Sequence, residues 1–76
     1  MQITVQAFAF LKEHLPDGGK ATVEVTPGTT IGELIALLEL PAGRVHVVFR
    51  NHRQAEREDV VEDGDRVAFF PPVAGG

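Results

Sequence analysis

The chain has 76 residues and no cysteine, and its seven Lys and Arg against eleven Asp and Glu give a net charge of −4. This length supports one domain with a small core, which leaves little room for an enclosed catalytic pocket. The lack of cysteine excludes disulfides and thiolate chemistry, and the negative charge disfavours binding to nucleic acids. No leader pattern or long apolar run is visible, so we expect a cytoplasmic protein that contacts no membrane.

The first third of the chain predicts a hairpin of two strands. Apolar and polar residues alternate over residues 2–7, which is the period of a strand with one buried face. Residues 8–15 lose this alternation and predict a helical turn, which the segment 16–19 closes. Residues 23–25 alternate again in a second strand that Pro and Gly at 27–28 end. The spacing suits antiparallel pairing of the two strands.

A helix is predicted to begin after Thr30. Thr30 and Glu33 can form a capping box, in which each side chain accepts a hydrogen bond from the backbone amide of the other residue. Apolar residues then recur at helical spacing, at Ile31, Leu34, Ile35 and Leu38. Pro41 disfavours helical geometry at Leu40 and should end the segment. One face of this helix is expected to cover a sheet.

Further short strands are predicted in the second half of the chain. Residues 45–50 alternate, so we expect the odd-numbered residues to face the helix and the even-numbered ones, Val48 among them, to face away. A turn is expected at 51–52, because Asn and His tolerate left-handed geometry, and a short return strand at 54–55. The valines at 60–61 are expected to re-enter the core.

The last strand is predicted at residues 66–70, after a tight turn at 62–65. In that strand Val67 and Phe69 should point inward, so the even-numbered residues should point away from the helix. The two prolines that follow cannot donate ladder hydrogen bonds, so the sheet should end there.

Two strands, a helix and then further strands predict an α+β domain with a mixed sheet of four to five strands packed around one main helix. This is the β-grasp arrangement of ubiquitin. We expect a single β-grasp domain at residues 1–70 and an extended, flexible C-terminal tail at 71–76.

The tail carries no charged and no polar side chain, and it ends in Gly75 and Gly76. Glycine projects nothing from its Cα, so such an end can lie extended in a narrow channel. A terminal carboxylate is ionised near neutral pH and is a poor acyl donor, so chemistry on it requires activation by another protein. Gly75 and Gly76 are therefore the candidate reactive residues.

The segment from Val61 to Gly76 resembles the C-terminal signature of the MoaD/ThiS sulfur carriers, most closely the small subunit of molybdopterin synthase. The resemblance extends loosely over the whole chain. Its specificity lies in Gly64-Asp65 and in the run Phe69-Phe70-Pro71-Pro72-Val73-Ala74-Gly75-Gly76.

In that family an E1-like enzyme uses ATP to adenylate the terminal carboxylate, and a sulfur donor protein supplies the sulfur of a thiocarboxylate. The resemblance implies that Gly76 carries this sulfur. It also implies donation for molybdopterin biosynthesis through the molybdopterin synthase large subunit or an equivalent acceptor enzyme. The chain would bind no cofactor or metal itself and would not be catalytic alone, because ATP is used by the activating partner.

Docking to such partners should depend on the folded body. Ordering Val73 to Gly76 costs roughly 4 to 8 kcal/mol, which such small side chains are unable to recover. On the expected strand parity Phe8, Val48 and Phe70 form an outward apolar patch, which we take as the candidate anchor. In the family, the positions that match Phe8 and Phe70 contact partner enzymes. The tail residues expected to bind the partner are Pro71, Pro72, Val73 and Ala74.

An alternative places Phe8 and Phe70 under a loop, as packing at the edge of the core. Other functions also remain open, namely a ubiquitin-like protein modifier or an interaction module with an inert end. Within the carrier class, the acceptor could also be a thiazole precursor of thiamine, an activated serine derivative that becomes cysteine, or a tRNA base. His14, His46 and His52 lack the spacing of metal ligands and are interpreted as surface residues.

Overall fold

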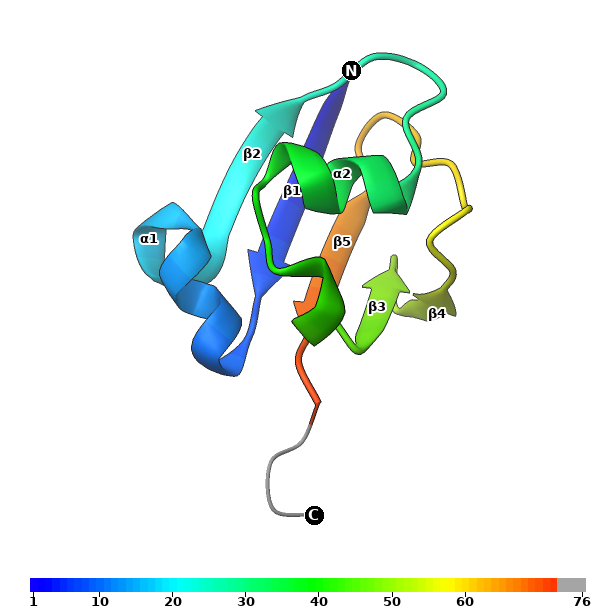
Figure 1. Cartoon of the computed structure of the whole chain (residues 1–76). Helices are drawn as coiled ribbons and strands as arrows, with labels where there is room; N and C mark the ends of the chain where they lie inside the picture. The colour runs from blue at the N-terminus through cyan, green and yellow to red at the C-terminus, as the bar shows by residue number, and fades with distance from the viewer. Residues whose placement is uncertain (73–76) are drawn as a thin grey trace.

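Over residues 1–72, which the computed structural model describes, five strands form one mixed sheet in the order β2-β1-β5-β3-β4. The elements follow the chain as β1 (Gln2–Ala7), η1 (Ala9–His14), α1 (Pro16–Gly19), β2 (Lys20–Glu24), α2 (Ile31–Leu37), η2 (Ala42–Arg44), β3 (Val47–Arg50), β4 (Arg53–Ala55) and β5 (Arg66–Phe70). The central pair β1 and β5 is parallel, and the other pairs are antiparallel. Figure 1 shows α2 lying across one face of this sheet, so the predicted β-grasp fold is confirmed.

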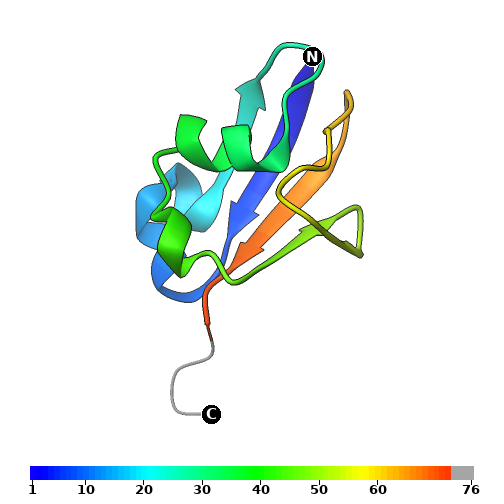
Figure 2. The ribbon, with the colours of Figure 1, turned by 45° about the vertical axis from the view of Figure 1, so that its right-hand side comes forward.

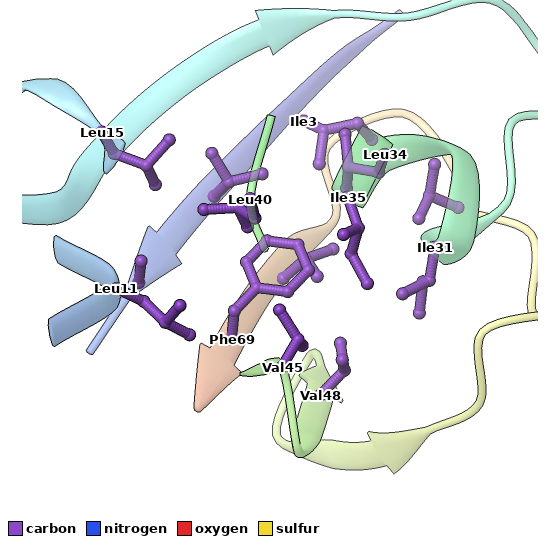
Figure 3. Packing of buried hydrophobic residues seen from close by; sticks show 14 of the residues in the cluster. Ile3, Leu11, Leu15, Ile31, Leu34, Ile35, Leu40, Val45, Val48 and Phe69 are labelled. Atoms are coloured by element: carbon purple, nitrogen blue, oxygen red, sulfur yellow. The ribbon is translucent and has the colours of Figure 1, made fainter. Parts of the chain in front are cut away.

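The core lies between the sheet and α2. The strand residues Ile3, Val5 and Phe69 are fully buried, and so are the helix residues Ile31 and Leu34. Figure 3 shows side chains from these elements converging on one cluster. The alternation predicted for the first and last strands is therefore confirmed.

The inward positions of the third strand were predicted wrongly. Val48 is only 4% exposed and belongs to the core, and Figure 3 shows it beside Val45 and Phe69. The prediction assumed a strand that alternates from Val45 onward. Strand β3 begins only at Val47, so the side chains before it do not follow that alternation. Val48 is paired with Phe69, and residues paired across two strands share a face. Phe49 consequently faces away from the helix.

One further detail of the core prediction is wrong. Val61 is buried as expected, whereas Val60 is 46% exposed. Val60 forms an isolated bridge with Thr30, and this contact holds the loop that leads into β5 against the start of α2. Among the described residues, no helix is long and apolar enough to cross a membrane.

The hairpin between β3 and β4 turns through two left-handed residues. Asn51 and His52 have φ values of 52° and 70°, and Arg50 pairs with Arg53 on either side of them. A two-residue hairpin with positive φ at both positions matches the right-handed twist of its strands. The turn predicted at these two residues is confirmed, and so is the short return strand.

Both ends of α2 are closed by local hydrogen bonds. The Glu33 amide donates to Thr30 Oγ1 at 3.1 Å and the Thr30 amide donates to Glu33 Oε1 at 2.9 Å, so the predicted capping box is present. At the other end the amide of Glu39 donates to the Ala36 carbonyl and that of Leu40 to the Ile35 carbonyl. This is a Schellman motif with Glu39 at a φ of 57°.

The Schellman motif gives a stability prediction, because glycine is the residue best suited to its left-handed position. We expect Glu39→Gly to raise the free energy of unfolding by about 1 kcal/mol. Urea denaturation of the two proteins measures the difference. Glu39→Ala is the control, since it removes the carboxylate but keeps the Cβ. A gain of equal size in Glu39→Ala would show that φ is not the cause.

Candidate docking face and tail root

The face of the sheet opposite α2 carries a groove. In Figures 1 and 2 the helices α2 and η2 lie on one side of the strands. The groove on the other face is lined by Thr4, Gln6, Phe8, Lys20, Phe49, His52, Arg66, Val67, Ala68 and Phe70. Apart from Val67, whose side chain belongs to the core, these are residues of the strands that face away from α2, together with Phe8 and His52, which follow β1 and β3.

Three phenylalanines line the groove beside Val67 and Ala68. The rings of Phe8 and Phe70 stack at a centroid distance of 4.5 Å with an angle of 4° between their planes. Phe49 meets Phe70 edge to face at 5.6 Å and 87°. Such aromatic pairs contribute about 0.5 to 1.5 kcal/mol each beyond their buried area. We call Phe8, Phe49 and Phe70 the aromatic cluster.

The local backbone explains why Phe8 reaches this face. Phe8 is extended, with φ −119° and ψ 159°, so it continues the alternation of β1. Its amide donates to the Phe69 carbonyl at 3.1 Å, which keeps it beside β5. Ala9 then takes a φ of 54° and turns the chain into η1.

The structure brings together two of the three residues predicted for the apolar patch. Phe8 and Phe70 are both half-buried and both line the groove, so they are not hidden beneath a loop. Val48 does not join them because it faces the core, and Phe49 takes its place. Phe49 could not be assigned to this face from the sequence. Because Val47, Val48 and Phe49 are all apolar, either Val48 or its two neighbours could have faced the core. The pairing of β3 with β5 decides between the two phases.

The tail leaves the sheet directly beside the aromatic cluster. The His46 amide donates to the Phe70 carbonyl at 2.8 Å, which extends the pairing of β5 to its last residue. Pro71 is buried and Pro72 is exposed. The predicted tail residues Val73, Ala74, Gly75 and Gly76 lie outside the described residues.

The groove also has a charged rim that the sequence reading did not single out. Lys20 and Arg66 are exposed at its edge, and His52 lies there with them. No Asp or Glu is among the residues that line it. The open face therefore combines an aromatic cluster with positive charge.

Asp65 connects the turn before β5 to the end of β3. It is 5% exposed. Its carboxylate accepts hydrogen bonds from Arg50 Nε, from Asn51 Nδ2 at 2.8 Å and from the Glu62 amide at 2.7 Å. Burial raises the pKa of Asp65, but the hydrogen bonds from Arg50, Glu62 and Asn51 together with the charge of Arg50 outweigh it and hold the pKa below its usual value.

Asp65 is therefore a structural residue whose charge stabilises the fold. The His residues form no comparable cluster. Within residues 1–72 no three side chains of His, Cys, Asp or Glu lie close enough together to hold a metal ion.

The depressed pKa of Asp65 predicts a pH-dependent stability. A carboxyl group with a lower pKa in the folded state contributes stability above its unfolded pKa of about 3.9 and loses it as the pH falls through the folded pKa. We expect Asp65→Asn to lower the free energy of unfolding at pH 7 by about 2 kcal/mol. The difference from the wild type should shrink as the pH falls from about 5 toward 2.

Urea denaturation across this pH range measures the effect. Asp17→Asn is the matched control, because Asp17 is exposed and its left-handed backbone suits Asn equally well. A difference between wild type and Asp65→Asn that stays constant with pH would contradict the assignment.

The comparisons with known proteins agree with this geometry. Residues 5–76 match the ThiS family. The whole chain is 33% identical, over 86 aligned positions, to the molybdopterin synthase sulfur carrier subunit of Mycobacterium tuberculosis, and the match covers 99% of that protein.

Two solved structures share the fold over nearly the whole chain. The small archaeal modifier protein 1 of H. volcanii is 29% identical with a TM-score of 0.77, covering 95% of this chain and 98% of that one. A chain of the Amycolatopsis orientalis BexX/CysO complex is 28% identical with a TM-score of 0.65, covering 97% and 99%.

The fold is a ubiquitin-like β-grasp domain whose open sheet face lies beside the root of the tail. Because the family match spans residues 5–76, this chain belongs to the ThiS family, the ThiS/MoaD sulfur carriers.

Proposed function

We propose that this carrier donates sulfur for molybdopterin biosynthesis. The observation that carries the proposal is the 33% identity over the full length to the molybdopterin synthase sulfur carrier subunit of Mycobacterium tuberculosis. In this proposal the carboxylate of Gly76 is adenylated by an E1-like enzyme that uses ATP. Sulfide delivered by a sulfur donor protein then attacks the acyl carbon and displaces AMP, and the carrier leaves with a thiocarboxylate.

The carrier then binds the large subunit of molybdopterin synthase, which catalyses the transfer of sulfur to a cyclic pterin precursor. The carrier supplies the reacting atom, binds no cofactor and performs no catalysis alone. Strand β5 ends at Phe70, which belongs to the aromatic cluster and directly precedes Pro71. A partner that receives the tail therefore also meets this cluster. The cluster therefore supplies the docking energy that the small tail residues lack.

A second candidate function is protein modification. It is favoured by the likeness to the small archaeal modifier protein 1 of H. volcanii, at 29% identity. Both functions begin with adenylation of Gly76 and differ in the acceptor, which is a small molecule in one case and an amino group of a protein in the other. A carrier for thiamine thiazole, cysteine or tRNA would likewise differ only in its acceptor.

Conversion of Gly76 tests the first step of the proposal. The purified chain is incubated with the adenylating enzyme of the same organism, MgATP and a sulfide donor. We expect intact-mass spectrometry to show a mass gain equal to the exchange of one oxygen for one sulfur. A chain shortened by Gly75-Gly76 is the control and should show none. An unchanged mass, although the enzyme is active on ATP, would refute the carrier function.

The aromatic cluster gives a second prediction from two neighbouring residues. We expect Phe49→Ala to weaken binding to the adenylating enzyme at least tenfold, because it removes a ring from the open face. Val48→Ala should leave that affinity nearly unchanged and should lower the free energy of unfolding by on the order of 2 kcal/mol, because it opens a cavity in the core.

Titration calorimetry and urea denaturation of both variants measure the two effects. Phe70→Ala should behave as Phe49→Ala does. If Val48→Ala weakened binding more than Phe49→Ala, the assignment of faces on β3 would be wrong.

A further inference from the structure

The groove on the open face is locally basic on a protein whose net charge is −4. Its lining contains Lys20 and Arg66 and no carboxylate. Between residues 1 and 72 the ion pairs involve the N-terminus with Glu24 and Arg50 with Glu62 and Asp65. Neither Lys20 nor Arg66 takes part in them. These two charges are therefore available to a partner.

The sheet register places the two cations around the aromatic cluster. One row across four neighbouring strands contains Lys20, Gln6, Ala68 and Phe49. Strands are about 4.8 Å apart, so the backbones of Lys20 and Phe49 are separated by roughly 14 Å. Arg66 lies two residues before Ala68 on β5, roughly 7 Å along the strand. The cations thus border the side of the groove that the phenylalanines leave open.

We propose that this groove selects a protein surface in which an apolar side chain is flanked by carboxylates, and that Lys20 and Arg66 steer its docking. The inference rests on the proposed function, and the partner it commits to is the adenylating enzyme. The aromatic cluster receives the apolar side chain and supplies most of the affinity. Lys20 and Arg66 attract the flanking carboxylates, which raises the association rate against the repulsion from the negative body.

A nucleic acid fits this groove poorly, although aromatic residues and cations also bind RNA. Single-stranded RNA stacks its bases on free aromatic faces, whereas Phe8 and Phe70 already stack on one another at 4.5 Å. Two lysine or arginine residues neutralise only about two phosphates. The rest of the surface is acidic and repels a longer strand.

Two variants with the same net charge test the proposal. Lys20→Glu combined with Arg66→Glu reverses the rim, and Lys12→Glu combined with Arg53→Glu makes the same charge change at exposed residues outside the groove. Association with the purified adenylating enzyme is followed by stopped-flow at low salt and at 1 M salt, where the Debye length is about 3 Å. We expect the rim variant to associate at least tenfold more slowly than the control variant at low salt, and within about threefold of it at 1 M.

Equal rates for the two variants at low salt would overturn the proposal, because net charge alone would then explain the effect. Should the rim variant have a lower melting temperature than the control, Lys20→Gln with Arg66→Gln replaces it and should still slow association. The proposal would also be overturned if the wild-type chain bound a single-stranded RNA oligonucleotide and the rim variant did not.

The thiocarboxylate assay on the same samples separates this inference from the proposed function. The wild-type chain could gain sulfur while the rim variant associates as fast as the control variant. That result would contradict only the role of Lys20 and Arg66. A wild-type chain that neither binds the enzyme nor gains sulfur contradicts both.

Discussion

The pairing of β5 with β1 and β3 fixes which residues face the core and which face the groove. Phe69 and Phe70 are adjacent in the chain, but the strand places their side chains on opposite faces of the sheet. Phe69 is fully buried beneath α2, and Phe70 stacks on Phe8 in the open groove. One strand of five residues therefore anchors the core and presents the docking face, and it ends where the tail begins. Slipping this strand by one residue would exchange the two faces.

Two sets of hydrogen bonds hold β5 and α2 in place, one around Asp65 and the other in the Schellman motif. Asp65 binds Arg50 and Asn51, so the start of β5 is held to the end of β3. The turn at Glu39 ends α2 while keeping Leu40 in the core. The residues that make these contacts do not line the groove. The open face carries three half-buried phenylalanines, and beside them Lys20 and Arg66, which form no ion pair within residues 1–72. An apolar cluster on an accessible face is typical of a partner site.

Most of the fold could be predicted from the sequence, because its signals were local. The capping box at Thr30 and Glu33, the alternation in β1 and the left-handed pair Asn51 and His52 each depend on neighbours within a few residues. The phase of β3 could not be predicted, since Val47, Val48 and Phe49 are all apolar and only the pairing with β5 distinguishes their faces. The shared position of Lys20 and Arg66 could not be predicted for the same reason. The two residues are far apart in the sequence, and only the register of β2, β1 and β5 brings them to one groove.

We propose that the sulfur carried by Gly76 passes to a pterin. This transfer can be followed in a single turnover with radioactive sulfur in the thiocarboxylate, the molybdopterin synthase large subunit and the cyclic pterin precursor. We expect the label to move to the pterin and the carrier to return to a free carboxylate. Label that remains on the carrier, or a carrier that becomes joined to lysine residues of other proteins, would refute the proposed transfer.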